Sequence, residues 1–106
     1  MATNMPSQYR LHAYICGRQC IERMSYMGTV DYRAIFNQCP LNCRYAVVSM
    51  WDIVRHEERV AVFDMDTTRT SYGTGALEIE PGPPIEYYST IDAAIMATAL
   101  LYEDNS

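Results

Sequence analysis

The chain has 106 residues, 49% of them hydrophobic and 20% charged, a balance that excludes wholesale disorder and fits one globular domain. Its formal net charge of −5 opposes direct binding to nucleic acid, which needs an electropositive surface. No basic and apolar leader opens the sequence, and its longest strongly apolar stretch, 93–102, is about half of a membrane span, so we expect a cytoplasmic protein without membrane contact.

The first elements are predicted to be helical. A helix is expected over 7–27, with Ser7 as its cap and Gly28 as its stop. A second, shorter helix is predicted over 29–38, ended by Pro40. The first helix is predicted from apolar residues at helical spacing: Ala13, Cys16, Cys20, Met24 and Met27.

The middle of the chain has the composition of a β-hairpin. Segments 44–54 and 59–65 are rich in Val, Ile, Tyr and Trp, and a charged turn separates them. A helix over 49–58 is the competing prediction, since Ser49 and Asp52 could form a capping box.

The next segments alternate between polar and extended character. A polar loop is expected over 66–75 and a short third strand over 76–80. A stiff, proline-rich connector over 81–84 leads to an extended segment over 85–88.

The last predicted helix has the clearest signals. Ser89 is expected to be its N-cap, Asp92 to complete a capping box at position N3, and Tyr102 to lie near its end. A helix that is apolar all round must be covered on more than one side. We therefore expect either that this helix lies across the sheet beneath the first helix, or that one face is left for a partner or for a second copy of the chain in a homodimer. The apolar residues are Ile91, Ala93, Ala94, Ile95, Met96, Ala97, Ala99, Leu100 and Leu101.

Together these elements predict an α+β fold, with N-terminal helices, an antiparallel sheet of three to four strands, and a C-terminal helix packed on the sheet. Residues 1–6 are expected to be a disordered lead-in to a single domain over 7–106.

Four cysteines fall in two C-x3-C pairs, Cys16 with Cys20 and Cys39 with Cys43. Zinc takes four soft ligands in a tetrahedron, so these four form the candidate metal site of an alternative interpretation, a small structural zinc domain. Free thiols, which a cytoplasmic location favours, and disulfides are the other interpretations. On the main interpretation we expect no cofactor and no metal.

Residues 60–68, V-A-V-F-D-M-D-T-T, resemble the first motif of haloacid-dehalogenase-type phosphatases. In that family a nucleophilic Asp and an acid/base Asp follow an apolar strand, and by position these would be Asp64 and Asp66. Only 38 residues follow Thr68, too few for the family's remaining units, and the chain has no lysine to match the family's phosphate-binding lysine. The sequence therefore predicts that the protein is not an enzyme.

Charge and composition favour protein binding. Residues 1–51 carry five Arg and two acidic residues, net +3, whereas 52–106 carry three Arg and eleven acidic residues, net −8. An acidic half attracts a partner with a basic surface. Nine Tyr and seven Met stand against two Phe and one Trp, and Tyr, Met and Arg are the types enriched in protein–protein interfaces.

The layout resembles that of small bacterial or phage antagonists, such as anti-activators that sequester quorum-sensing transcription factors and anti-CRISPR proteins. A hairpin over 44–65, an acidic segment and a helix opening at Ser89 carry the resemblance. It implies a non-enzymatic regulator that inhibits a DNA-binding regulator or a nucleic-acid machine by direct protein–protein binding. The candidate contact residues combine aromatic anchors with acidic steering groups: Trp51, Tyr72, Tyr87, Tyr88, Glu78, Glu80 and Glu86.

Overall fold

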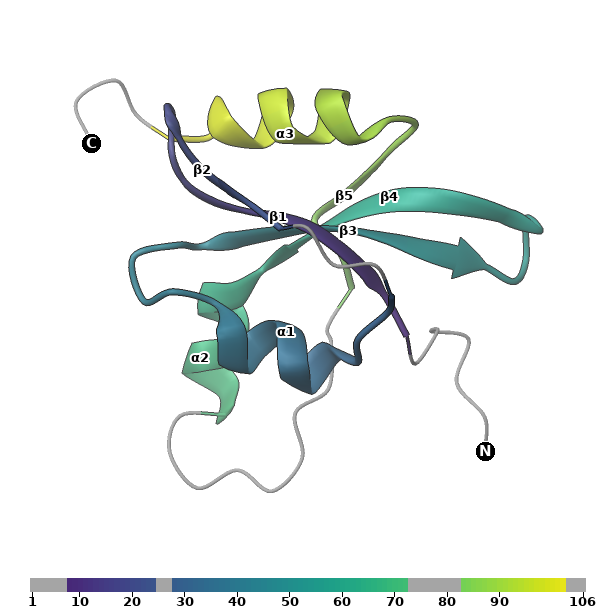
Figure 1. Ribbon diagram of the computed structural model, residues 1–106, viewed down its shortest axis with the longest axis horizontal. Coiled ribbons are helices and arrows are strands. Elements are labelled where there is room, and N and C mark those ends of the chain that lie inside the picture. Colours follow the sequence, from purple (N-terminus) through teal and green to yellow (C-terminus); the bar gives the residue numbers. More distant parts are fainter. Residues whose placement is uncertain (1–7, 25–27, 73–82, 103–106) are drawn as a thin grey trace.

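A computed structural model describes residues 8–24, 28–72 and 83–102. In it a five-stranded antiparallel sheet of order β2-β1-β3-β4-β5 carries α3 on one face and α1 and α2 on the other (Figure 1). The α+β class and a last helix packed on the sheet are confirmed, but the sheet has five strands instead of three or four. In chain order the elements are β1 (Arg10–Gly17), β2 (Cys20–Arg23), α1 (Tyr32–Gln38), β3 (Tyr45–Asp52), β4 (Glu57–Asp64), α2 (Met65–Tyr72), β5 (Glu86–Tyr88) and α3 (Ile91–Ala99).

Both faces of the sheet are buried. On the α1 side, the rings of Tyr9, Tyr32 and Phe63 meet edge to face, with centroids 5.2–6.2 Å apart. On the α3 side, Val47 and Val62 pack with Ala94, Ile95 and their neighbours. The two helical layers therefore enclose the middle strands of the sheet.

The predicted helix over 7–27 is wrong, because its described part forms the β1–β2 hairpin. In β1, Tyr14 packs on the α1 side and Ile15 on the α3 side. A strand buried on both faces is apolar throughout, and its pattern then resembles that of a buried helix. The predicted lead-in over 1–6 and the expected cap at Ser7 lie outside the described residues.

The second helix and the central hairpin are confirmed. α1 begins at Tyr32, where Asp31 Oδ1 accepts a hydrogen bond of 2.8 Å from the backbone N–H of Ala34. β3 and β4 pair along their whole length, from Tyr45 with Asp64 to Asp52 with Glu57, so the competing helix over 49–58 is wrong.

A helix, α2, occupies the first part of the predicted polar loop over 66–75. Asp64 directly precedes this helix, and its Oδ1 accepts a hydrogen bond of 2.9 Å from the backbone N–H of Asp66, which is the pattern of an N-cap. The predicted strand over 76–80 and the first half of the connector over 81–84 lie outside the described residues. β5 confirms the extended segment over 85–88.

α3 is capped one residue later than predicted. Thr90, not Ser89, is its N-cap, and the Thr90 hydroxyl accepts a hydrogen bond of 3.1 Å from the backbone N–H of Ala93. The helix ends at Ala99, so Tyr102 lies beyond it. Within the described ranges, no helix is long and apolar enough to cross a membrane.

Candidate protein-binding surface

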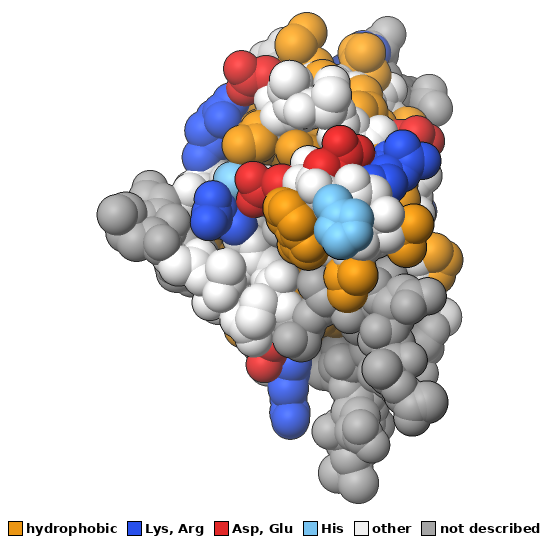
Figure 2. Space-filling model, turned by 90° about the vertical axis from the view of Figure 1, so that its right-hand side faces the viewer, with side chains coloured by type: hydrophobic (Ala, Val, Ile, Leu, Met, Phe, Trp, Pro, Cys, Tyr) orange, Lys and Arg blue, Asp and Glu red, His pale blue; other side chains and the backbone are white. Residues whose placement is uncertain are grey.

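The turn end of the β3–β4 hairpin projects beyond all three helices (Figure 1). It carries three exposed apolar side chains: Trp51, which is 52% exposed, Ile53, 52%, and Val54, 77%. Seen from the side to which the hairpin points, hydrophobic side chains lie next to a histidine and have acidic and basic groups around them (Figure 2). These apolar side chains keep half or more of their surface exposed, so this end is suited to burial against another molecule.

Asp52 fixes the shape of the turn. Its Oδ1 accepts hydrogen bonds of 3.0 Å and 3.1 Å from the backbone N–H groups of Val54 and Arg55, and its Oδ2 lies 3.3 Å from Arg59 Nη1. The hydrogen bond from the Arg55 backbone is the main cause that lowers the pKa of Asp52, and Arg59 adds to it. Since the turn is already ordered, binding through it costs little conformational entropy.

A hollow of about 310 Å³ lies beside this end of the hairpin. β5 pairs only with residues Val60–Val62 of β4, so the hollow lies where β5 ends. The Arg59 guanidinium covers the Tyr87 ring at 3.9 Å from its centroid, a cation–π contact. The residues around the hollow are Arg55, Glu57, Glu58, Arg59, Tyr87, Tyr88 and Ser89.

Three of the predicted contact residues therefore lie at one end of the sheet. Tyr87 and Tyr88 line the hollow, and Trp51 pairs in the sheet register with Glu58, which also lines it. Sequence reasoning missed Ile53 and Val54, although an apolar pair inside a charged turn was a signal that could have identified them. We define the hairpin-end surface as Trp51, Ile53, Val54, Tyr87 and Tyr88.

The other predicted contact residues lie elsewhere. Glu86 is exposed at the start of β5. Tyr72 is the last residue of α2, and the position of its side chain is not described. Glu78 and Glu80 lie outside the described residues.

Sequence reasoning also missed a contact between His12 of β1 and Ser49 of β3. His12 Nε2 lies 2.6 Å from Ser49 Oγ, a hydrogen bond joining two neighbouring strands. Burial is the main cause that lowers the pKa of His12, Arg10 lowers it further, and Glu58 opposes them. The imidazole is therefore mostly neutral at pH 7.

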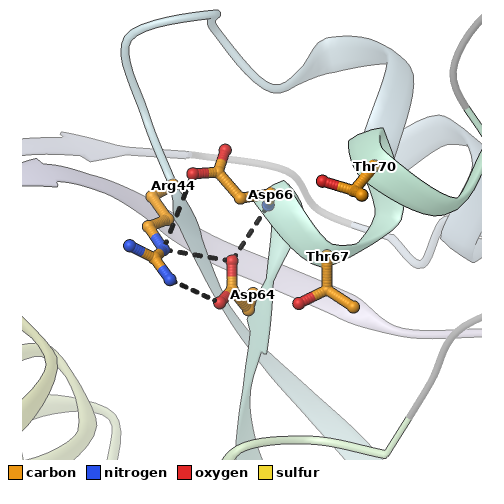
Figure 3. A pocket seen from close by; sticks show the side chains of 5 residues that line it. All are labelled: Arg44, Asp64, Asp66, Thr67 and Thr70. Carbon is orange, nitrogen blue, oxygen red and sulfur yellow. Dashed lines mark hydrogen bonds and ion pairs between the residues drawn. The ribbon is translucent and has the colours of Figure 1, made fainter.

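Asp64 and Asp66, which match the phosphatase motif, lie beside a hollow of about 300 Å³ with Thr67 and Thr70 (Figure 3). Both carboxylates face Arg44, whose Nη2 lies 3.0 Å from Asp64 Oδ2 and whose Nε lies 3.7 Å from Asp66 Oδ2. With the N-cap described above, these contacts give both aspartates a structural role at the junction of β4 and α2.

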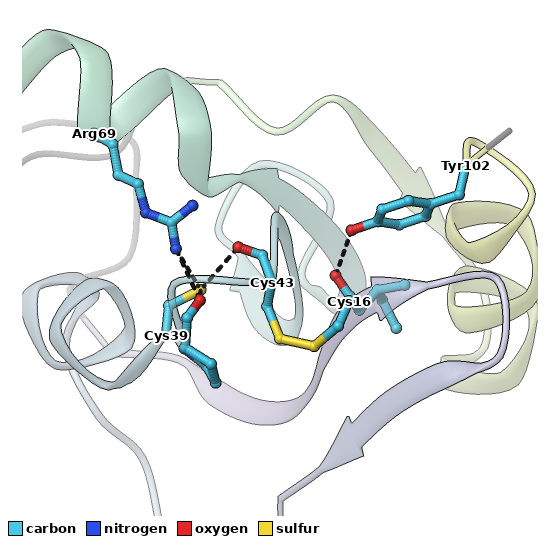
Figure 4. Close-up of a disulfide and its surroundings, with 7 residues drawn as sticks. Cys16, Cys39, Cys43, Arg69 and Tyr102 are labelled. Atoms are coloured by element: carbon cyan, nitrogen blue, oxygen red, sulfur yellow. Dashed lines mark hydrogen bonds between the residues drawn. A yellow bond between two sulfur atoms is a disulfide. The ribbon is translucent and has the colours of Figure 1, made fainter. Parts of the chain in front are cut away.

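The four cysteines do not form one set of ligands. Cys16 and Cys43 are joined in a disulfide, Cys20 is exposed, and Cys39 is buried (Figure 4). The Cys39 sulfur accepts a hydrogen bond of 3.3 Å from Arg69. Burial raises the pKa of the Cys39 thiol more than Arg69 lowers it. Among the residues that the structure describes, no three of His, Cys, Asp and Glu gather into a group that could hold a metal ion.

Comparisons of the chain with protein-family models, with curated proteins and with solved structures found no match.

Proposed function

We propose that the protein is a non-enzymatic regulator that binds another protein through the hairpin-end surface. The observation that carries this proposal is the exposure of Trp51, Ile53 and Val54 on a turn held in place by hydrogen bonds to Asp52. A large aromatic and two β-branched side chains on an ordered turn, with charged groups around them, are typical of an interface centre and its polar rim.

The partner that we propose has a basic surface, as a DNA-binding regulator or a nucleic-acid machine does. The acidic half of the sequence supplies β4 and β5, and β5 forms the edge of the sheet opposite β2. Arg18 and Arg23 belong to the β1–β2 hairpin. Glu57 and Glu58 lie beside the hairpin-end surface together with Arg55 and Arg59, and Glu86 lies at the start of β5. Carboxylates beside an apolar centre would steer a basic partner toward it.

On this proposal the protein acts in the cytoplasm as an antagonist, and it covers the basic surface with which its partner would otherwise bind nucleic acid. The zinc-domain alternative would need all four cysteines as thiolates, whereas Cys16 and Cys43 are bonded to each other.

The proposal is tested by affinity capture from host lysate at low and at high salt, with three forms of the protein. We compare the wild type, the double variant Trp51→Ser/Val54→Ser, and Leu41→Ser as a matched control. Leu41 is also an exposed apolar residue, 90% exposed, but it lies outside the hairpin-end surface. We expect the wild type and Leu41→Ser to recover the same protein at low salt, and the double variant to recover at least tenfold less, as expected for the loss of an interface centre.

The recovered protein is then assayed for nucleic-acid binding with and without the purified wild type. Inhibition that the double variant fails to reproduce supports the antagonist role. Equal recovery by all three forms, or no specific protein at either salt, contradicts the proposal.

A further inference from the structure

Each end of the disulfide has a free cysteine four residues away in sequence, Cys20 for Cys16 and Cys39 for Cys43. The two free thiols differ in environment, because Cys20 is exposed and Cys39 is buried. A free thiol near a disulfide can exchange with it. Exchange with the Cys16–Cys43 disulfide therefore requires that one of these two thiols lies near it.

Cys20 faces the same side of the sheet as the disulfide. Along β1, Tyr14 packs on the α1 side and Ile15 on the α3 side, so Cys16 returns to the α1 side, where it packs against that core. Along β2, Ile21 packs on the α3 side, so the preceding Cys20 points to the α1 side.

The strand register brings the two cysteines next to each other. Ile15 pairs with Ile21 and Gly17 pairs with Cys20, so Cys16 lies at the irregularity between two paired positions. A Cβ placed on Gly17 would lie 3.6 Å from the Cys20 Cβ, which shows how closely β2 approaches the end of β1.

The order of the strands also favours displacement at the Cys16 sulfur. β1 lies between β2 and β3, and Cys43 immediately precedes the segment that enters β3. Cys20 and Cys43 therefore belong to segments on opposite flanks of β1. Displacement at a disulfide sulfur requires the attacking thiolate to lie opposite the leaving sulfur, and this strand order is compatible with attack by Cys20 from one flank and departure of Cys43 toward the other.

We propose that Cys20 is an exchange thiol that isomerises the Cys16–Cys43 disulfide. The Cys20 thiol gives its proton to solvent, and the thiolate attacks Cys16 Sγ. The Cys16–Cys20 bond forms as the Cys16–Cys43 bond breaks, and Cys43 leaves as a thiolate that takes a proton from solvent. One disulfide and two thiols are present before and after the step, so it consumes no oxidant and no reductant.

Cys39 provides the contrast within the same molecule. Its buried thiol has a raised pKa, so little of it is the thiolate that exchange needs. The released Cys43 would nevertheless have Cys39 as a neighbour, since Cys39 Sγ lies 3.6 Å from the Cys43 carbonyl oxygen.

The exchange would change what the disulfide constrains. The Cys16–Cys43 bond joins residues 27 apart in sequence and ties the end of β1 to the loop before β3. A Cys16–Cys20 bond would close only the turn of the β1–β2 hairpin, and a shorter loop restricts the unfolded chain less. The isomerised form should therefore unfold at a lower temperature. This inference does not rest on the proposed function.

Trypsin separates the cysteines in a way that identifies each form. Cleavage after arginine leaves Cys16 in peptide 11–18, Cys20 in 19–23, and Cys39 with Cys43 in 34–44. The purified protein is held without oxygen at mildly alkaline pH, quenched with acid, alkylated, digested and analysed by mass spectrometry. We expect the 11–18/34–44 pair to decline and the 11–18/19–23 pair to appear over minutes to hours.

Two controls keep the result specific. Cys39→Ser should exchange as the wild type does. Alkylation of the exposed Cys20 thiol before the incubation should keep the 11–18/34–44 pair unchanged, and Cys20→Ala should have the same effect. The inference is overturned if the isolated protein holds four free thiols, if 11–18/34–44 remains the sole linked pair in the wild type, or if that pair declines equally after Cys20 is alkylated.

Discussion

The hydroxyl of Tyr102 donates a hydrogen bond of 2.7 Å to the backbone carbonyl of Ile15, across 87 residues of sequence. The same ring meets Tyr45 edge to face, with centroids 5.8 Å apart. Burial is the main cause that raises the pKa of the Tyr102 hydroxyl. These contacts fasten the segment that follows α3 to β1 and β3, and so hold the helix on the sheet.

Tyr102→Phe should lower the free energy of unfolding by about 1 kcal/mol, because it removes this hydrogen bond and keeps the ring contact. Urea unfolding followed by tryptophan fluorescence measures the change. Tyr88→Phe is the matched control, since Tyr88 also packs on the α3 side and burial and Glu86, without a hydrogen bond, raise the pKa of its hydroxyl. Equal effects of the two substitutions would show that the bond to Ile15 adds nothing.

Tyr9 and Tyr14 form a second matched pair. The Tyr14 hydroxyl donates to the Ile35 carbonyl at 2.5 Å, whereas the buried Tyr9 hydroxyl has no hydrogen-bond partner in the described part of the chain. Burial is the main cause that raises the pKa of Tyr9 to about 12. We expect Tyr14→Phe to cost about 1–2 kcal/mol and Tyr9→Phe to be neutral or stabilising by up to about 1 kcal/mol, since it removes a buried polar group without a partner. Thermal unfolding of both variants decides this, and a loss of stability in Tyr9→Phe would contradict it.

Stability should fall as the pH drops from about 7 through 6, because of His12. The unfolded chain binds a proton at His12 with a pKa near the ordinary value of about 6.5. In the folded protein that pKa is lowered, so the unfolded state binds more protons in this range and unfolding is favoured as the pH falls. The contribution is fully present above the unfolded pKa and is lost as the pH falls through the folded one.

Thermal unfolding between about pH 5.5 and 7.5 measures this dependence, above the range in which ordinary carboxylates titrate. His12→Gln should flatten the curve. A slope that survives His12→Gln would assign the dependence to another group.

The sequence predicted local elements well where composition or a helix-ending residue is explicit. The helix corresponding to α1 was predicted to end before Pro40, and the β3–β4 hairpin was predicted from two segments rich in Val, Ile, Tyr and Trp around a charged turn. Burial by α1 on one side and α3 on the other removes the alternation that marks a strand in β1, as it does in β3 and β4. β1 was mistaken for a helix because it also lacks their valines, with Ile15 as its one β-branched residue. Composition along the chain carries no information about this second layer.

The candidate site was predictable only in part, for a related reason. Trp51, Tyr87 and Tyr88 are suitable types in any interface, but their proximity depends on β5 adding to β4, a pairing between segments about 26 residues apart. The contact between His12 and Ser49 and the disulfide between Cys16 and Cys43 depend in the same way on β1 lying beside β3. A motif is defined by the spacing of residues along the chain, whereas these sites join residues that are neighbours across the sheet.

The homodimer expected from the all-round apolar α3 stays a prediction. The exposed residues of α3 now indicate which side of the helix a second copy would cover. Ala94, Ile95 and Thr98 face the sheet and are buried, whereas Met96 and Leu100 are 68% and 65% exposed. The sheet thus covers one side of the helix. A second copy would bury the other side, on which Met96 and Leu100 lie one helical turn apart. Light scattering after size exclusion should give a mass near twice 12.1 kDa at micromolar concentration.

Met96→Glu should shift that mass to 12.1 kDa, because a carboxylate buried between two apolar helices is costly without a partner. Asp92→Asn, on the same helix but in its first turn, is the control and should leave the dimer in place. Circular dichroism of both variants separates a lost interface from a lost fold. A wild-type mass of one chain across the micromolar range would mean that α3 tolerates an exposed apolar side, and the hairpin-end surface would then be the main candidate for all association by this protein.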